Sequence, residues 1–121
     1  MALSNPGKRS SSELRAPAAL HILMVLAEGE RHGYGIKQAL ENQTEGRLRL
    51  GPGTLYEALY RLADTGWIEE VEDSGAPQRR RVYRITAAGR RALRAELAQL
   101  ETIVIEARAR KLLPGTRASR T

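Results

Sequence analysis

Residues 51–86 read GPGTLYEALYRLADTGWIEEVEDSGAPQRRRVYRIT, which is a helix signal followed by two strand signals. Glycine and proline open the segment as turn formers, and apolar residues then recur at helical spacing until Gly66 ends the helix. The apolar residues that share one helical face are Leu55, Ala58, Leu59 and Leu62. We therefore predict an amphipathic helix with one face buried in a core and the opposite face available to a partner.

The two strand signals follow this helix directly. Residues 67–72 and 80–85 carry strand-forming side chains, and the turn formers of residues 74–77 separate them. Three consecutive arginines, Arg79, Arg80 and Arg81, span the start of the second strand, with Arg79 just before it. The pattern predicts a β-hairpin with a basic second strand.

Two shorter helix signals precede residue 51. Pro17 suits the first position of a helix that Gly29 ends, and a second helix is predicted over residues 33–42 after a turn at residues 30–32. Residues 1–15 contain turn formers and few apolar side chains, so we expect a loose basic arm there.

A long helix signal follows the hairpin, with Thr86 as a good N-cap and with Pro114 and Gly115 at its end. Its apolar residues step by four and three, which is the spacing of a coiled-coil seam. The residues of this seam are Leu93, Leu97, Leu100, Val104 and Ala107. We expect the seam to form a dimer interface; the alternative is a helix that folds back on its own domain.

The predicted fold class is mainly α with a small β-hairpin, in the order helix, helix, helix, strand, strand, long helix. This order is that of a winged helix-turn-helix followed by a C-terminal dimerisation helix. The predicted organisation is a flexible basic arm at residues 1–15, a winged helix-turn-helix DNA-binding domain at residues 16–86, a dimerisation helix at residues 87–113 and a basic tail at residues 114–121.

Three stretches resemble the PadR family of transcriptional regulators in order and spacing: HGYGI at residues 32–36, GTLYEALYRLADTG at residues 53–66 and RVYRITAAGRRAL at residues 81–93. The resemblance implies a dimeric repressor whose third helix enters the major groove of DNA. The β-hairpin, called the wing, then touches the flanking DNA backbone. The single terminal helix is similar to that of the short subgroup. No aromatic residue follows Tyr83, so we do not expect the tryptophan-stacked aromatic ligand that some short members bind.

The charge distribution favours a polyanionic partner, because the chain has a formal net charge of +6. Residues 51–72 hold one arginine against five acidic residues, whereas residues 73–86 hold four arginines against Asp73 alone. We therefore expect base-edge contacts from the acidic third helix and phosphate contacts from the basic wing.

The residues expected to face DNA lie on three elements. They are Tyr34 and Lys37 on the second helix, Gly53, Thr54, Tyr56, Tyr60 and Arg61 on the third, and Arg79, Arg80 and Arg81 on the wing. Backbone amides and hydroxyls can bind phosphate, and arginine can bind phosphate or guanine. The alternatives are that Tyr56 packs at the domain surface and that the arginine run only keeps a strand edge solvated.

Several classes of function find no support in the sequence. The chain has no cysteine, and it lacks a phosphate-binding glycine loop and any recognisable catalytic grouping. We therefore expect no enzyme activity, no cofactor and no metal. The longest apolar run, residues 16–27, is too short to span a bilayer, and no signal peptide is recognisable, so we expect a cytoplasmic protein without a membrane partner.

Together these features predict a sequence-specific DNA-binding transcriptional regulator. The expected form is a ligand-responsive repressor that acts as a homodimer on a near-palindromic operator in double-stranded DNA, with a small-molecule inducer that the sequence does not identify. Two alternatives remain open: a winged-helix module that binds a protein, and an architectural DNA binder without sequence specificity.

Overall fold

The computed structural model describes residues 16–73 and 80–114 of the 121-residue chain. The elements are, in chain order, α2 (Ala16–Ala27), β1 (Arg31–His32), α3 (Gly33–Gln43), α4 (Pro52–Asp64), β2 (Ile68–Asp73), β3 (Arg80–Ile85) and α5 (Ala87–Ala109). The expected arm at residues 1–15, the hairpin loop with Arg79, and tail residues 115–121 lie outside the described residues.

Local sequence signals account for the ends of α4 and α5. Pro52 opens α4, where its missing N–H costs no helical hydrogen bond. After α4 the chain passes through Gly66, whose φ of 86° is a conformation that glycine adopts readily. The hydroxyl of Thr86 accepts a hydrogen bond from the amide of Gly89 at 3.0 Å, which confirms Thr86 as the N-cap of α5.

The sheet has three antiparallel strands in the order β1-β3-β2. Strands β2 and β3 form the predicted hairpin, with Ile68 opposite Ile85 and Asp73 opposite Arg80. The turn expected at residues 30–32 is wrong in part, because Arg31 and His32 pair with β3 as a third strand. Two residues are too few to show strand periodicity, and their partners lie about fifty positions further along the chain.

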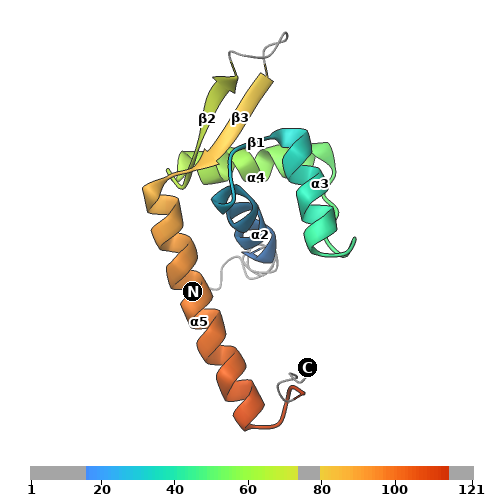
Figure 1. The fold of residues 1–121 in the computed structure, drawn as a ribbon, viewed down its shortest axis with the longest axis vertical. Helices are drawn as coiled ribbons and strands as arrows, with labels where there is room; N and C mark the ends of the chain where they lie inside the picture. The colour runs from blue at the N-terminus through green and yellow to red at the C-terminus, as the bar shows by residue number, and fades with distance from the viewer. Residues whose placement is uncertain (1–15, 74–79, 115–121) are drawn as a thin grey trace, which may run out of the picture.

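The hydrophobic core lies where α2, α3, α4 and the inner face of the sheet meet (Figure 1). The fully buried side chains are Ile22, Leu23, Val25, Leu26, Ile36, Leu40, Leu55, Leu59 and Ile68. Each such aliphatic side chain contributes about 1.5–3 kcal/mol of transfer free energy. The apolar stripe predicted for α4 therefore points into the core, and the winged helix-turn-helix architecture is confirmed.

Helix α5 leaves this core after its first turns. Gly89 and Leu93 are its buried residues, and Figure 1 shows the rest of the helix running away from the winged helix-turn-helix domain. Within the described chain, α5 packs mainly against α2 and β3. Most of its length therefore has no partner element among the described residues of the chain.

Candidate nucleic-acid interface

The outward face of α4 is exposed to solvent. Leu55, Leu59 and Leu62 point into the core, so the opposite side of the amphipathic helix faces solvent. Tyr60 on this side is 71% exposed. At the N-terminal end, a Cβ placed on Gly53 would meet no atom within 4 Å, so a ligand can approach the backbone of the first turn closely.

An ion pair lies across this outward face. The Nη2 atom of Arg61 donates a hydrogen bond of 2.9 Å to Oε2 of Glu57, one helical turn earlier. Both side chains are more than half exposed. Helix α4 carries one more charged residue, Asp64, so its outward surface is slightly acidic.

Tyr56 lies at the edge of this face and packs against α3. A Cβ on Gly33 would overlap the Tyr56 hydroxyl group, so the missing side chain at Gly33 allows the phenol to cover the first turn of α3. Tyr56 remains about half exposed. The side chain therefore fixes α4 against α3 while keeping one edge in solvent.

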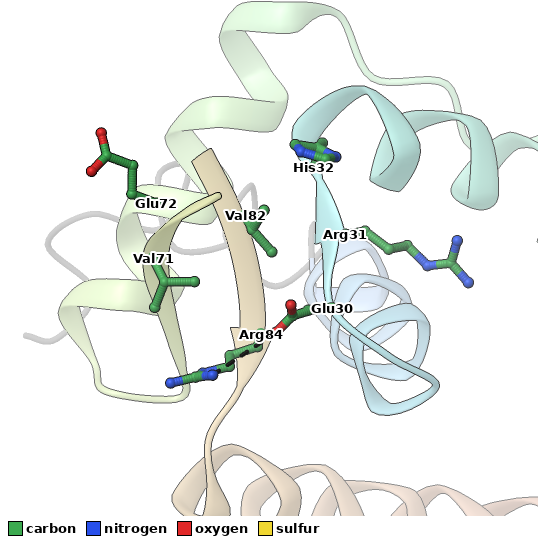
Figure 2. Close-up of a pocket in the computed structure, with 7 residues that line it drawn as sticks. All are labelled: Glu30, Arg31, His32, Val71, Glu72, Val82 and Arg84. Carbon is green, nitrogen blue, oxygen red and sulfur yellow. Dashed lines mark ion pairs between the residues drawn. The ribbon is translucent and has the colours of Figure 1, made fainter. Parts of the chain in front are cut away.

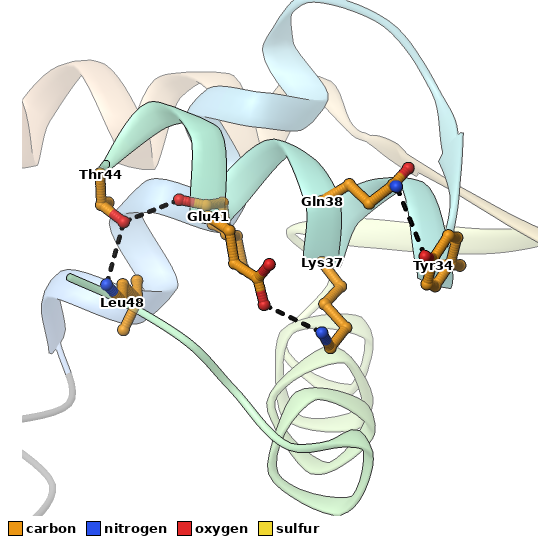
Figure 3. Close-up of polar contacts among 7 residues, drawn as sticks. Tyr34, Lys37, Gln38, Glu41, Thr44 and Leu48 are labelled. Carbon is orange, nitrogen blue, oxygen red and sulfur yellow. Dashed lines mark hydrogen bonds and ion pairs between the residues drawn. The ribbon is translucent and has the colours of Figure 1, made fainter. Parts of the chain in front are cut away.

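The two candidate residues of α3 differ in how strongly their polar groups are bound by neighbouring side chains (Figure 3). The ammonium group of Lys37 lies 2.9 Å from Oε2 of Glu41, and this hydrogen bond from Lys37 lowers the pKa of the Glu41 carboxyl. Tyr34 is 66% exposed, and its hydroxyl accepts a hydrogen bond of 3.4 Å from Gln38. Lys37 must break an ion pair to reach a phosphate, whereas Tyr34 is accessible as it stands.

Two arginines of β3, Arg81 and Arg84, are paired with carboxylates of β2. Arg81 forms an ion pair with Glu70, and the hydrogen bond within this pair raises the pKa of Arg81. The Nε atom of Arg84 donates a hydrogen bond of 2.8 Å to Glu69. Arg80 stands opposite Asp73 in the strand register. By sequence, β2 contributes four acidic residues to the paired strands and β3 contributes three arginines, so the formal charge of the two strands is close to balanced.

A shallow hollow of about 490 Å³ lies on the outer face of the sheet (Figure 2). Val71 and Val82 contribute its apolar part, and an ion pair of 3.9 Å joins Glu30 to Arg84 at one end. Of the candidate DNA-binding residues that the structure describes, none lines this hollow. Those candidates thus do not converge on a pocket; they lie on open surface.

Two arginines that the sequence analysis did not single out lie in the connector between α3 and α4. Arg47 and Arg49 are exposed and lie a few residues before the N-terminus of α4. Thr44 holds the start of the connector by donating to the Leu40 carbonyl at 2.8 Å and accepting from the Leu48 amide at 2.9 Å (Figure 3). The sequence signal for them was available, because two basic residues stand within the four positions before Gly51.

The described residues, 16–73 and 80–114, show neither a metal-ion site nor a membrane-spanning helix. No group of three or more histidine, aspartate and glutamate side chains there is arranged to hold a metal ion. No helix in those ranges is both long and apolar enough to cross a lipid bilayer.

A core of three helices, a small antiparallel sheet and the exposed face of the third helix, α4, define a winged helix-turn-helix protein. The profile described as "Transcriptional regulator PadR-like family" matches residues 22–95, more than half of the chain. The chain therefore belongs to the PadR-like family of transcriptional regulators, and the resemblance found in the sequence is confirmed.

Relatives and solved structures agree with this assignment. The transcriptional regulator Rv3488 of Mycobacterium tuberculosis is 39% identical over 92 residues, which cover 76% of this chain and 83% of the relative. A transcriptional regulator from Clostridium thermocellum matches with a TM-score of 0.71 at 27% identity, over 86% of this chain and 97% of that one. Bacillus subtilis PadR in complex with operator DNA matches with a TM-score of 0.59 at 25% identity, over 66% of this chain and 46% of that one.

Proposed function

We propose that this protein is a sequence-specific DNA-binding repressor that inserts α4 into the major groove. The observation that carries the proposal is the outward face of α4, where Thr54, Tyr60 and Arg61 are exposed above a core-facing leucine stripe. Hydroxyl and guanidinium groups at such positions suit phosphate and base edges. Support comes from Bacillus subtilis PadR, a fold relative whose structure includes operator DNA. In this proposal the protein binds DNA in the cytoplasm and is not an enzyme.

The proposed active form is a homodimer joined through α5. Leu97 and Leu100 are 37% and 41% exposed in the single chain, and Ile103 is 61% exposed. An apolar seam in water at the end of a small domain favours association with a second copy. A two-fold dimer then places two α4 helices about one DNA turn, roughly 34 Å, apart and requires a near-palindromic operator. Release by a small-molecule inducer is part of the proposal.

A gel shift of the protein on its own promoter region, with and without excess random DNA, tests the proposed function. A repressor of this type gives a complex that survives the competitor. An architectural binder loses the complex to random DNA, and a protein-interaction module forms no complex with either DNA. Either of these last two results contradicts the proposed function.

Replacing Tyr60 or Arg61 by Ala is expected to reduce discrimination between operator and random DNA by about 1–3 kcal/mol while the protein stays folded. Both side chains are exposed on the outward face of α4 and make little contribution to the core. Fluorescence anisotropy with both DNAs measures the difference. Arg110→Ala is the matched control, because Arg110 also follows a glutamate by four residues, at 3.8 Å, but at the C-terminal cap of α5. Equal losses on both DNAs would make Tyr60 and Arg61 phosphate anchors instead.

Replacing Arg79 and Arg80 by Ala is expected to weaken binding to all DNA sequences. The slope of log affinity against log salt should fall by about one unit for each phosphate that the variant no longer neutralises. Arg81→Ala is expected to change the slope less, because the Arg81 guanidinium is already neutralised by Glu70. DNA affinity measured over a range of salt concentrations gives the slopes of the wild-type protein, the double variant and Arg81→Ala. An unchanged slope in the double variant would remove the wing from the interface.

A further inference from the structure

Glu57 occupies the centre of the outward face of α4. At about 100° per residue, it lies at least 140° around the helix from each of the buried residues Leu55, Leu59 and Leu62. Gly53 lies one turn before it on the same side, and Arg61 lies one turn after it. A helix that enters the major groove with this face forward therefore presents Glu57 closest to the groove floor.

A carboxylate at that position is repelled by phosphates, so it needs a hydrogen-bond donor on the bases. In the major groove, the exocyclic N4 amino group of cytosine is the donor that glutamate recognises. Guanine presents two acceptors, O6 and N7, that match the two donors of an arginine. A C·G base pair thus carries both partners on one edge.

Glu57 and Arg61 already stand side by side as acceptor and donor. Their hydrogen bond of 2.9 Å holds the guanidinium beside the carboxylate, and both groups are accessible, with side-chain exposures of 55% and 66%. Because their charges cancel, the pair adds little to general attraction for DNA. Contacts to base edges, unlike attraction to phosphates, do not need a net positive charge.

We propose that Glu57 and Arg61 jointly read one C·G base pair in each operator half-site. Glu57 accepts a hydrogen bond from cytosine N4, and it also positions the guanidinium of Arg61 toward O6 and N7 of the guanine. This inference rests on the proposed function, since it requires α4 to be the recognition helix.

Selection of binding sites from random double-stranded DNA, with the full-length protein, tests the inference. The wild-type protein is expected to fix a C·G pair at one position of each half-site, with about tenfold to hundredfold discrimination. Glu57→Gln is expected to change the preference at that position toward adenine, because glutamine binds N6 and N7 of adenine. Arg61→Lys is expected to weaken the preference at the same position, since lysine lacks the fork of donors.

Asp64→Asn is the matched control. Asp64 lies seven residues after Glu57 on the same face of α4, but at the C-terminal end, away from the part of a recognition helix that meets the bases. Both acid-to-amide changes remove one negative charge, so both should raise affinity for random DNA. Only Glu57→Gln should change the selected sequence, and circular dichroism verifies that each variant is folded.

The results of the binding-site selection distinguish a failure of this inference from a failure of the proposed function. If the wild-type protein selects a consensus and Glu57→Gln selects the same one with equal discrimination, the role of Glu57 is wrong. If Glu57→Gln and Arg61→Lys alter different base pairs, joint reading is wrong. If the wild-type protein selects no consensus at all, the proposed function itself fails.

Discussion

Changing Leu97 and Leu100 together to Lys is expected to convert the proposed dimer to a monomer and to weaken operator binding by about a thousandfold or more. That is the lower end of the ratio between specific and non-specific DNA binding. The two leucines lie on the exposed seam of α5, beyond the point where Leu93 is buried in the core of its own chain. Two lysines in the seam would have to be desolvated next to the corresponding lysines of a second copy.

Light scattering at micromolar concentration measures the oligomeric state, and fluorescence anisotropy measures operator affinity. The control is Ala95→Lys with Thr102→Lys, which adds the same two charges to exposed residues on the opposite side of α5. The control should remain dimeric and should bind the operator. A monomeric wild-type protein, or a dimeric Leu97→Lys, Leu100→Lys variant, would contradict the proposed role of α5.

Gly89→Ala is expected to destabilise the fold by about 3 kcal/mol, the upper part of the range for overpacked sites. A Cβ at Gly89 would overlap the backbone carbonyl oxygen of Trp67 and would lie 2.9 Å from the side chain of Ile85. The backbone here has little room to move. Thr86 donates to the carbonyl of Gly66 at 2.6 Å, and the Thr86 amide donates to the Trp67 carbonyl at 3.0 Å.

The sign of this effect is diagnostic, because alanine in an open helix site is more favourable than glycine by roughly 1 kcal/mol. Gly35→Ala in α3 provides that open site, since its Cβ would meet only the Arg31 side chain at 3.7 Å. Urea denaturation should therefore show a small stabilisation for Gly35→Ala and a large loss for Gly89→Ala. Equal stability of Gly89→Ala and the wild-type protein would contradict this prediction. It would show that Gly89 and the Trp67 backbone can move apart without a loss of stability.

Thermal unfolding gives an independent measure of the stability that Gly89→Ala loses. For a domain of this size, each kcal/mol corresponds to a Tm change of several degrees. Because Gly89 lies on α5 and not on α4, this variant should keep the DNA sequence preference of the wild-type protein at temperatures where it is folded.

The helices, the hairpin and the helix ends could be predicted from the sequence because their signals are local. The apolar spacing of α4, Pro52 at its start and Thr86 before α5 each act through residues within one or two turns. The same spacing indicated which face of α4 is outward and therefore where Tyr60 and Arg61 lie. The family was also recognisable, since its motifs are short and contiguous.

The third strand and the charge of the wing depended on the tertiary structure. A charge count along the sequence places the acidic residues of β2 in a separate segment before the basic arginines. In the fold, however, Glu69 pairs with Arg84 and Glu70 pairs with Arg81, so these charges neutralise each other. Likewise, β1 forms only because β3 returns to pair with it. The sequence by itself determined the elements and their buried faces, whereas folding decided which charges stay available to a partner. The physical reason is that helical periodicity acts over a few residues, while strand pairing and ion pairing join residues that only the fold brings together.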